Sequence, residues 1–347
     1  MSDLIKLKIG FYLKWPKGMF NSKGWNVIGD ELLADSMVKA LNTFPNISAD
    51  LYAPNFLPDS RLDFMIYLND NEPEKEFAKF HVLYMQNAYE EGSEIILKKN
   101  QEIGFDGYVF ISNKLLGIHK MSGRDGLFLP FGVDTSLFYP REKCLKYKFD
   151  IAYVGNDIKG EERTMNYLYP AVKYNFGLFG NWDFSPQKPE FIIRKKIWLS
   201  FFSYLKQSSE YKKALNAIPL YKIKFSEISK GKIPQEDVPI LYSSAKINLN
   251  CTHQDCVDWD VITLRTMEVL ACKGFVISDR VSVAEKILKD CMVFTDGNND
   301  LECKIDYYLT HEKERNEIAE IGYNYVVNNA TVQARMKELI VFLEGIK

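Results

Sequence analysis

Short apolar runs alternate with amphipathic segments along the whole chain. In the first half, these runs are continuous, as in strands of a buried parallel sheet. They span residues 7–13, 49–52, 64–68, 81–85, 108–112 and 127–130. After the first of them, apolar residues at helical spacing predict a helix over residues 26–41. Strands that alternate with helices predict an α/β domain with a parallel sheet.

The same pattern restarts after residues 140–148, a polar and basic segment that is typical of a linker. The second half predicts strands over residues 149–154, 176–179, 220–225, 246–249, 275–278 and 292–294. Helices are predicted from residue 161, over 189–217 (an insertion), and over 261–272, 302–309, 312–328 and 331–343. We therefore expect two Rossmann-like domains, residues 1–140 and 149–330. Their parallel sheets would face a central cleft, since ligands of open α/β sheets bind at the carboxyl ends of strands.

Composition and charge narrow the range of partners. Hydrophobic residues make up 46% and charged residues 26%, and the formal net charge is -2. Nucleic-acid-binding domains are normally strongly basic, so this near-neutral net charge gives no support for nucleic-acid binding. The chain has 6 cysteines but is too large to need disulfides, which favours a reducing, cytoplasmic compartment. No run reaches the ~18 apolar residues of a membrane span, so any membrane contact is expected to be peripheral.

The most informative stretch is residues 260–279, which predicts a helix that ends at Gly274 and leads directly into a buried strand. Arg265 and Glu268 are three residues apart and share a helix face. A helix N-terminus with an arginine suits a diphosphate, and a carboxylate one turn further could accept hydrogen bonds from a ribose diol. An ordinary intrahelical ion pair between the two explains the spacing as well.

This stretch, with the tail behind it, resembles the C-terminal half of GT-B-fold glycosyltransferases of the broad family-1/family-4 type. It is most similar to the subgroup related to the spore maturation protein CgeB, which carries Arg-x-Phe-Glu before a turn of small residues. Here the sequence is Arg265-Thr266-Met267-Glu268, then Ala271-Cys272-Lys273-Gly274. The wider class often has two acids eight residues apart, here Asp260 and Glu268. By resemblance, Glu268 would hold the donor ribose, Arg265 the leaving diphosphate, and Asp260 and Thr266 would complete the donor site.

Two further segments match the donor half of this family. Tyr153-Val154-Gly155-Asn156 resembles the first loop of the donor domain, which faces the donor phosphates. Arg163 and Lys159 are the basic candidates that follow it. Lys230-Gly231-Lys232 matches a glycine turn before a short helix at the nucleotide, where Lys230 or Lys232 could neutralise a diphosphate. A solvated helix start and a surface charge cluster explain these two segments as well.

Two segments of the first half are expected on the acceptor side of the cleft. The 129–140 segment resembles the sequence motif that ends the amino-terminal domain in this family. A structured linker would explain the same residues equally well. The glycine-bearing loop 14–25 follows the first strand, and its tryptophans could stack on a sugar or pack the loop. The residues expected at the cleft are Trp15, Gly24, Trp25, Gly132 and Asp134. In the family, the last helix, here 331–347, packs back on the first domain.

Among the four histidines, His253 is the best placed to act as a general base, because it directly follows a strand. It lies in Cys251-Thr252-His253-Gln254-Asp255-Cys256, which offers only three zinc-type ligands. We therefore expect a loop that lines the cleft. The resemblance to GT-B enzymes implies a reaction that needs neither a metal nor another cofactor.

The resemblance implies a glycosyltransferase that moves a sugar from a nucleotide-sugar donor in the second domain to an acceptor in the first. The acceptor would be a glycan, a lipid-linked molecule or a protein, and no nucleic acid is expected. Catalysis would depend on orientation and on stabilisation of the leaving diphosphate. Two alternatives stay open: a GT-B-fold sugar-nucleotide epimerase, which would need more acid/base groups in the cleft, and a non-catalytic nucleotide- or sugar-binding module.

Overall fold

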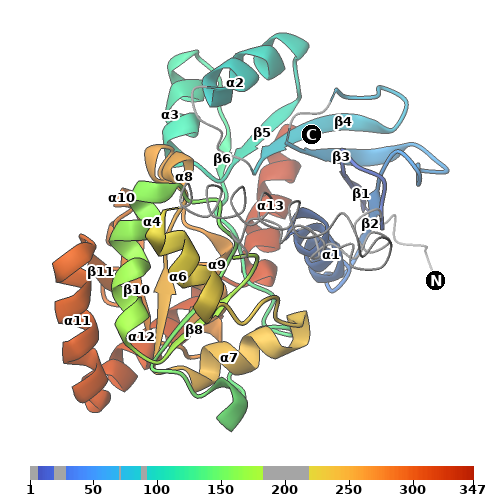
Figure 1. Ribbon diagram of the computed structural model, residues 1–347. Helices are drawn as coiled ribbons and strands as arrows, with labels where there is room; N and C mark the ends of the chain where they lie inside the picture. The colour runs from blue at the N-terminus through green and yellow to red at the C-terminus, as the bar shows by residue number, and fades with distance from the viewer. Residues whose placement is uncertain (1–6, 19–28, 70–71, 87–91, 183–218) are drawn as a thin grey trace, which may run out of the picture.

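The computed structural model describes residues 7–18, 29–69, 72–86, 92–182 and 219–347 (Figure 1). The expected helix 189–217 and the candidates Gly24 and Trp25 lie outside these residues. Two parallel sheets are present. The first has the order β2-β1-β3-β4-β5-β6 and the second the order β11-β10-β9-β7-β8. The expected α/β fold with two parallel sheets is therefore confirmed.

The first domain is built on a six-stranded sheet. Its strands are β1 (Leu7–Tyr12), β2 (Ile47–Tyr52), β3 (Leu62–Leu68), β4 (Ala78–Met85), β5 (Gly107–Phe110) and β6 (Leu127–Phe128). Its helices are α1 (Gly29–Leu41), α2 (Gly92–Ile103) and α3 (Asn113–Met121). The strands β3 and β5, each paired on both sides, are buried along almost their whole length, as expected of continuous apolar runs in a parallel sheet covered on both faces.

The second domain is built on a five-stranded sheet. Its strands are β7 (Ile151–Val154), β8 (Phe176–Phe179), β9 (Ile247–Asn250), β10 (Val276–Asp279) and β11 (Val293–Thr295). Its helices are α4 (Glu161–Tyr167), α6 (Leu220–Ile228), α7 (Val238–Ser244), α8 (Gln254–Asp258), α9 (Leu264–Ala271), α10 (Ser282–Ile287), α11 (Asn298–Thr310) and α12 (Glu312–Asn329). None of the helices in the described ranges is long and apolar enough to cross a membrane.

One element differs in kind from the expectation. Residues 220–225, predicted as a strand, lie in the helix α6. Tyr221 and Phe225 are four residues apart and both buried, which places them on one helical face against Trp182 and β8. A short aromatic run fits either element, and here only the packing partner decides between them.

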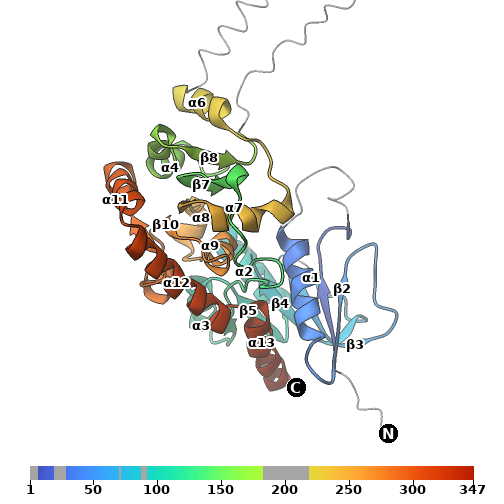
Figure 2. The ribbon, with the colours of Figure 1, turned by 90° about the horizontal axis from the view of Figure 1, so that it is seen from below.

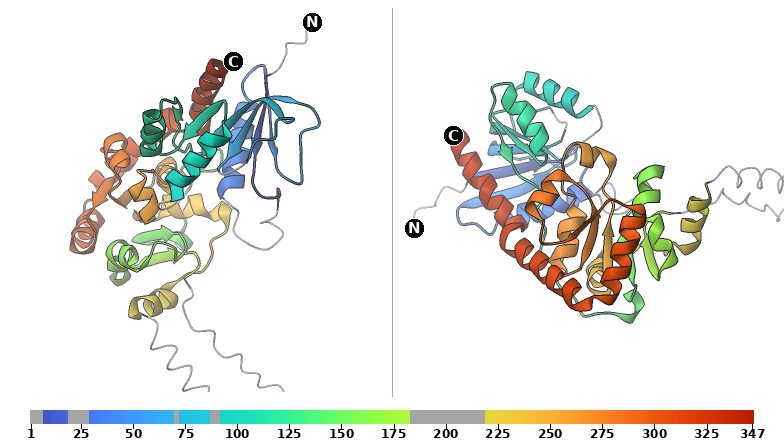
Figure 3. Two further views of the ribbon diagram at one scale, coloured as in Figure 1. Left: turned by 90° about the horizontal axis from the view of Figure 1, so that it is seen from above. Right: turned by 90° about the vertical axis from the view of Figure 1, so that its left-hand side faces the viewer.

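The final helix, α13 (Val332–Ile346), crosses from the second domain to the first (Figures 2 and 3). Its buried side chains join the core of the first sheet, where α13 packs beside α1. These side chains are Val332, Met336, Leu339 and Leu343. The chain leaves the first domain at the same place, since Val133 N–H donates to Ala330 O at 2.9 Å and Val332 N–H donates to Val133 O at 3.0 Å.

The carboxyl edges of the two sheets face each other. Ser112, just beyond β5, donates its hydroxyl to Trp259 O at 2.5 Å. Lys114 Nζ donates to Asp258 O at 2.9 Å and lies over the Trp259 ring. Trp259 and Val261 are buried in the core of the first domain, although they belong to the loop that follows β9 and α8. The loops at the carboxyl end of the second sheet therefore reach directly into the first domain.

Candidate functional site

Arg265 lies at the centre of the carboxyl edge of the second sheet, in the first turn of α9. Asn250 at the end of β9 accepts a hydrogen bond from its guanidinium at 3.1 Å, and the guanidinium carbon lies 4.9 Å from the centre of the Tyr153 ring on β7. Asn250 is itself held by Ser278, which accepts from its amide at 2.9 Å. No side chain caps the N-terminus of α9. The free N–H groups of this turn and the fixed guanidinium form a positive end suited to an anion.

Lys159 adds a second positive charge beside Arg265. It is only 9% exposed, and burial together with the nearby Arg265 charge lowers its pKa to about 8. Within the described part of the chain, its ammonium has no hydrogen-bond or ion-pair partner, and no carboxylate lies within ion-pair distance of Arg265. Two adjacent cations without a facing acid are costly unless an anion binds between or beside them.

Glu268 lies one turn along α9 from Arg265. It keeps part of its surface accessible but lies deep among protein atoms, and this burial raises the pKa of its carboxyl to about 7, although Arg265 lowers it. In the described structure, no hydrogen bond or ion pair joins the Glu268 carboxylate to Arg265 or to another residue. The ordinary intrahelical ion pair is therefore not formed, and the carboxylate is available to accept hydrogen bonds from a ligand.

The predicted glycine loops cross at the same edge. Gly155 follows β7 and Gly180 follows β8; a side chain on Gly180 would lie 2.1 Å from Gly155 O. Gly180 N–H donates to Gly231 O at 2.9 Å, and Asn156 Oδ1 accepts from Asn181 N–H at 2.9 Å. The structure thus brings Gly155, Asn156 and Gly231 together. Lys230 and Lys232 flank this crossing as exposed side chains.

Arg163 is tied into the protein rather than free. Its guanidinium donates to Thr252 O at 2.7 Å and to Gln254 Oε1 at 2.9 Å, and it forms a short ion pair with the buried Asp279. Asp279 also accepts from the backbone and hydroxyl of Thr252. These bonds fix the loop after β9 against the end of β10. Arg163 therefore positions the loop that carries His253.

Asp260 and Thr266 also make internal contacts. Asp260 adopts a positive φ of 58°, and its carboxylate accepts from Val283 N–H at 2.6 Å, in the first turn of α10. Thr266 is buried, with its hydroxyl 3.2 Å from that of Thr263. Of the two acids eight residues apart, only Glu268 lies on α9 with an unpartnered carboxylate in the described structure.

His253 caps α8 at the boundary with the first domain. Its Nδ1 accepts from Asp255 N–H at 3.3 Å and lies 3.4 Å from the Asp255 carboxylate. The ring is partly exposed, and α8 leads directly to Trp259 at the interdomain contact. A histidine here could reach a group bound between the carboxyl edges of the two sheets. Among the described residues, no group of three or more His, Cys, Asp or Glu side chains is placed to hold a metal ion.

The first-domain candidates fall at two places. Trp15, beyond β1, is 50% exposed. Phe56, beyond β2, is also exposed, and the Lys17 ammonium lies 5.1 Å from its ring centre. Gly132 and Asp134 lie where the chain changes domain. A side chain on Gly132 would meet Thr331 O at 2.9 Å, and Asp134 accepts from Ser36 at 2.7 Å. These two residues hold the domain connection together.

The sequence reasoning gave too little weight to Tyr153, Asn250 and Lys159. Each follows or ends a strand at the carboxyl edge, so position alone indicates the site. The contact of Arg265 with Asn250 joins residues from two elements, and no sequence spacing shows it.

Together, these features define an α/β protein with two parallel sheets, the second of which has a positively charged carboxyl edge. A family model described as "Glycosyl transferase-like" matches residues 173–341. No curated protein sequence matches the chain.

Several solved structures share the whole fold. Sucrose-phosphate synthase from Thermosynechococcus elongatus has a TM-score of 0.65 and 12% identity over 99% of this chain and 100% of that one. Anabaena HepE, in complex with UDP and glucose, has a TM-score of 0.62 and 10% identity over 98% and 100%. T4 phage BGT, in complex with its UDP-glucose substrate, has a TM-score of 0.58 and 14% identity over 97% and 99%.

The similarity to these structures confirms the predicted GT-B fold. The family model shows that residues 173–341 are similar to glycosyl transferases, and the solved structures share the fold of the whole chain.

Proposed function

We propose that the donor is a uridine diphosphate sugar, bound at the carboxyl edge of the second sheet. The observation that carries this proposal is the unneutralised pair Lys159 and Arg265 beside the unpartnered carboxylate of Glu268. The two cations and the N-terminus of α9 would hold the diphosphate, and Glu268 would accept hydrogen bonds from the ribose hydroxyls. The uridine base is suggested by structural relatives that were solved with UDP or UDP-glucose.

Catalysis would depend on stabilising charge on the leaving diphosphate as the sugar–phosphate bond breaks. Arg265 is already fixed by Asn250 and Tyr153, so it needs no reorganisation when this charge develops. Lys230 and Lys232, on the loop that crosses Gly155 and Gly180, are further candidates for the phosphates. His253 would accept the proton of the acceptor hydroxyl. We expect this chemistry to proceed without a metal, as is typical of the GT-B enzymes that the sequence resembles.

We propose that the acceptor, a glycan or a lipid-linked molecule, binds to the first domain near Trp15 and Phe56. Both aromatic side chains are exposed at the carboxyl edge of the first sheet, and aromatic faces suit sugar rings. The neighbouring Lys17 would also allow peripheral contact with an anionic membrane surface. All six cysteines are free thiols, in keeping with the cytoplasmic location proposed from the sequence.

The test is to incubate the full-length protein with a panel of nucleotide sugars and to measure free nucleotide, interconverted sugar and UDP affinity. Release of UDP supports transfer, interconversion of the sugar supports an epimerase, and binding without turnover supports a binding module. Glu268→Gln should weaken UDP binding by about tenfold or more, because it removes a charged acceptor for the ribose hydroxyls. The matched control Glu344→Gln changes an exposed carboxylate on α13. Equal UDP affinity in wild type and Glu268→Gln would refute the ribose assignment.

A further inference from the structure

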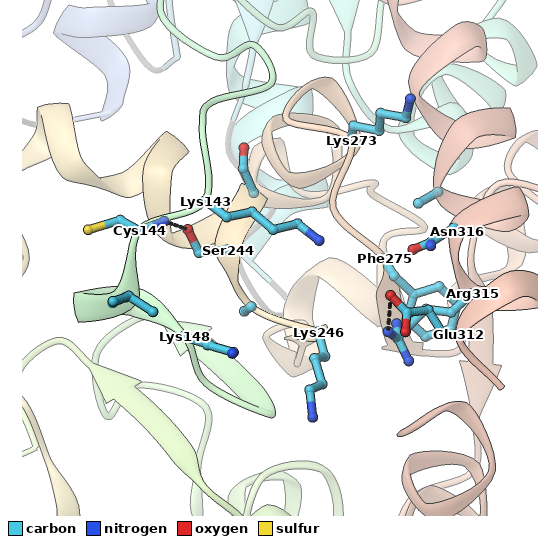
Figure 4. A pocket seen from close by; sticks show the side chains of 14 residues that line it. Lys143, Cys144, Lys148, Ser244, Lys246, Lys273, Phe275, Glu312, Arg315 and Asn316 are labelled. Carbon is cyan, nitrogen blue, oxygen red and sulfur yellow. Dashed lines mark hydrogen bonds and ion pairs between the residues drawn. The ribbon is translucent and has the colours of Figure 1, made fainter. Parts of the chain in front are cut away.

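A pocket of ≈ 460 Å³ opens at the amino edge of the second sheet, at the far end of β9 and α9 from Arg265 (Figure 4). We call it the rear pocket. Its lining comes from the segments that precede β7, β9 and β10 and from α12. The segments before the strands contribute Lys143, Lys148, Ser244, Lys246 and Lys273. Nothing in the proposed transfer reaction uses this end of the domain.

The rear pocket is lined by five cationic side chains and one anionic side chain. The cations are Lys143, Lys148, Lys246, Lys273 and Arg315, and the anion is Glu312. Lys246 pairs with Asp150 at 2.7 Å, and Lys273 pairs closely with Glu320. When these two acids are included, the cations remain in excess by two. The rear pocket thus carries a local excess of positive charge in a chain whose net charge is -2.

Lys143 and Lys148 supply the excess positive charge of the rear pocket. Both are exposed, and neither ammonium has an ion-pair or hydrogen-bond partner among the described residues. Figure 4 shows them on one side of the pocket, across from Arg315 and Asn316 on α12. The ammonium groups and the guanidinium therefore surround a common space from two walls.

Arg315 forms the fixed wall of the rear pocket. It is only 5% exposed, and its guanidinium is held by a short hydrogen bond to Tyr308 O. Its carboxylate neighbour Glu312 lies 3.9 Å away and is mostly exposed, so it neutralises the guanidinium weakly. A buried, oriented guanidinium with free lysines opposite is a geometry that suits phosphate oxygens.

Lys273 lies in the pocket wall although its backbone conformation is unfavourable for a lysine. It has a φ of 56°, the left-handed conformation that favours glycine at the end of a helix. The glycine of this turn, Gly274, lies one position later, where a side chain would clash with Val269, Asn248 and Tyr242 O. A lysine at the left-handed position costs stability on the order of 1 kcal/mol, and this cost places one more cation at the pocket.

We propose that the rear pocket is a second ligand site that binds a phosphate-bearing group, either of a free small molecule or of a lipid headgroup. The pocket volume falls within the usual range for small-molecule sites, about 300–1,000 Å³. Ser244 lies before β9 and also lines the pocket; its hydroxyl accepts from Cys144 N–H at 3.0 Å and can still donate its own hydrogen to a phosphate oxygen.

The test measures binding to the full-length protein in saturating UDP, which occupies the donor site. One arm titrates glycerol 3-phosphate by calorimetry. The other measures co-sedimentation with phosphatidylcholine vesicles, with and without phosphatidylglycerol. The variant Lys143→Gln/Lys148→Gln should weaken binding by about tenfold or more, since each lysine would lose a charged hydrogen bond. Saturable binding of glycerol 3-phosphate identifies a free ligand, whereas binding to phosphatidylglycerol vesicles alone identifies a headgroup.

The matched control is Lys289→Gln/Lys337→Gln, which removes the same charge at exposed positions outside the pocket. It should bind within about twofold of wild type, and Lys143→Arg/Lys148→Arg should retain binding, since arginine keeps the charge. Absence of binding in both arms overturns the proposal, as does an equal loss in the control double variant. A protein that fails to bind UDP but loses phosphate binding in Lys143→Gln/Lys148→Gln would refute the proposed donor and leave the rear pocket supported.

Discussion

Lys159 and Glu268 carry shifted pKa values for the same physical reason. Both lie deep at the carboxyl edge of the second sheet, where burial disfavours the charged form of each. The pKa of Lys159 falls to about 8 and that of Glu268 rises to about 7. Each group therefore titrates close to neutral pH. A ligand that needs both groups charged can bind tightly only over a narrow pH range.

This narrow range predicts a bell-shaped pH dependence of UDP affinity. Below about pH 7, Glu268 takes up a proton and can no longer accept two hydrogen bonds from the ribose. Above about pH 8, Lys159 loses its proton and its attraction for the diphosphate. Calorimetric titration of UDP between these limits and beyond them should show the highest affinity between pH 7 and 8. The Lys159→Arg variant should keep its affinity above pH 8, because arginine stays protonated. An alkaline limb unchanged in that variant would remove Lys159 from the site.

Glu268 also links the stability of the free protein to pH. Its pKa is raised from 4.5 in the unfolded chain to about 7 in the folded protein, so the folded form holds the proton more tightly. The stability that this group contributes is full below pH 4.5 and is lost as the pH rises to about 7. Glu268→Gln removes the ionisation, so at pH 8 it should be more stable than wild type by about 3 kcal/mol, with no such gain at low pH. Denaturant unfolding of both proteins at the two pH values measures this difference, and an equal difference at both would contradict the shifted carboxyl.

At the scale of the element, two adjacent residues end α9, one with an unfavourable backbone conformation and the other in a tightly packed position. Lys273 takes the left-handed conformation, while Gly274 provides the close approach to Val269 and Tyr242. Lys273→Gly should therefore raise the unfolding free energy by about 0.5–1 kcal/mol, less the exposed ion pair with Glu320. Urea unfolding of the variant measures the gain. The control Lys273→Ala loses the same ion pair but keeps the strain, so it should show no gain.

This turn also shows what the sequence can predict. The helix, its stop near Gly274 and the buried strand β10 follow from spacing and residue type, and the structure contains them. The identity of the left-handed residue does not follow, because it depends on the space left by Val269 and Tyr242. The failure at α6 has a similar cause, since an apolar run of that length packs as a helix only because Trp182 and β8 lie beside it.

Site residues are predictable to the extent that they sit at strand ends. Gly155, Arg265 and Glu268 belong to segments whose position along the chain already indicates the carboxyl edge. The partners of Arg163 and Asp260 do not follow from the sequence. Arg163 binds Asp279, 116 residues away, and Asp260 binds Val283, 23 residues away. Whether a charge is free for a ligand or used inside the protein is a tertiary property, so it is visible only once the chain is folded.

In the whole molecule, two segments from the second half of the chain pack into the core of the first domain. The last helix, α13, supplies buried side chains to the first domain, and the loop after α8 places Trp259 and Val261 in the same core. The domains are thus connected by packing as well as by the backbone hydrogen bonds between Val133 and residues 330 and 332. Any change in the relative position of the two sheets has to occur around these contacts.

This arrangement predicts that Leu339→Ala destabilises the first domain, although residue 339 lies near the C-terminus. Leu339 is fully buried against the first-domain core, and its truncation should cost about 2–5 kcal/mol. Hydrogen exchange should speed up in β1, β3 and β4 and stay close to wild type in β7 and β9. Val341→Ala, on the exposed face of the same helix, is the control and should leave exchange unchanged. Equal acceleration in β7 and β9 would contradict this prediction, because it would mean that the two domains unfold as one unit. The contacts of α13 and Trp259 would then couple the two domains so strongly that neither opens without the other.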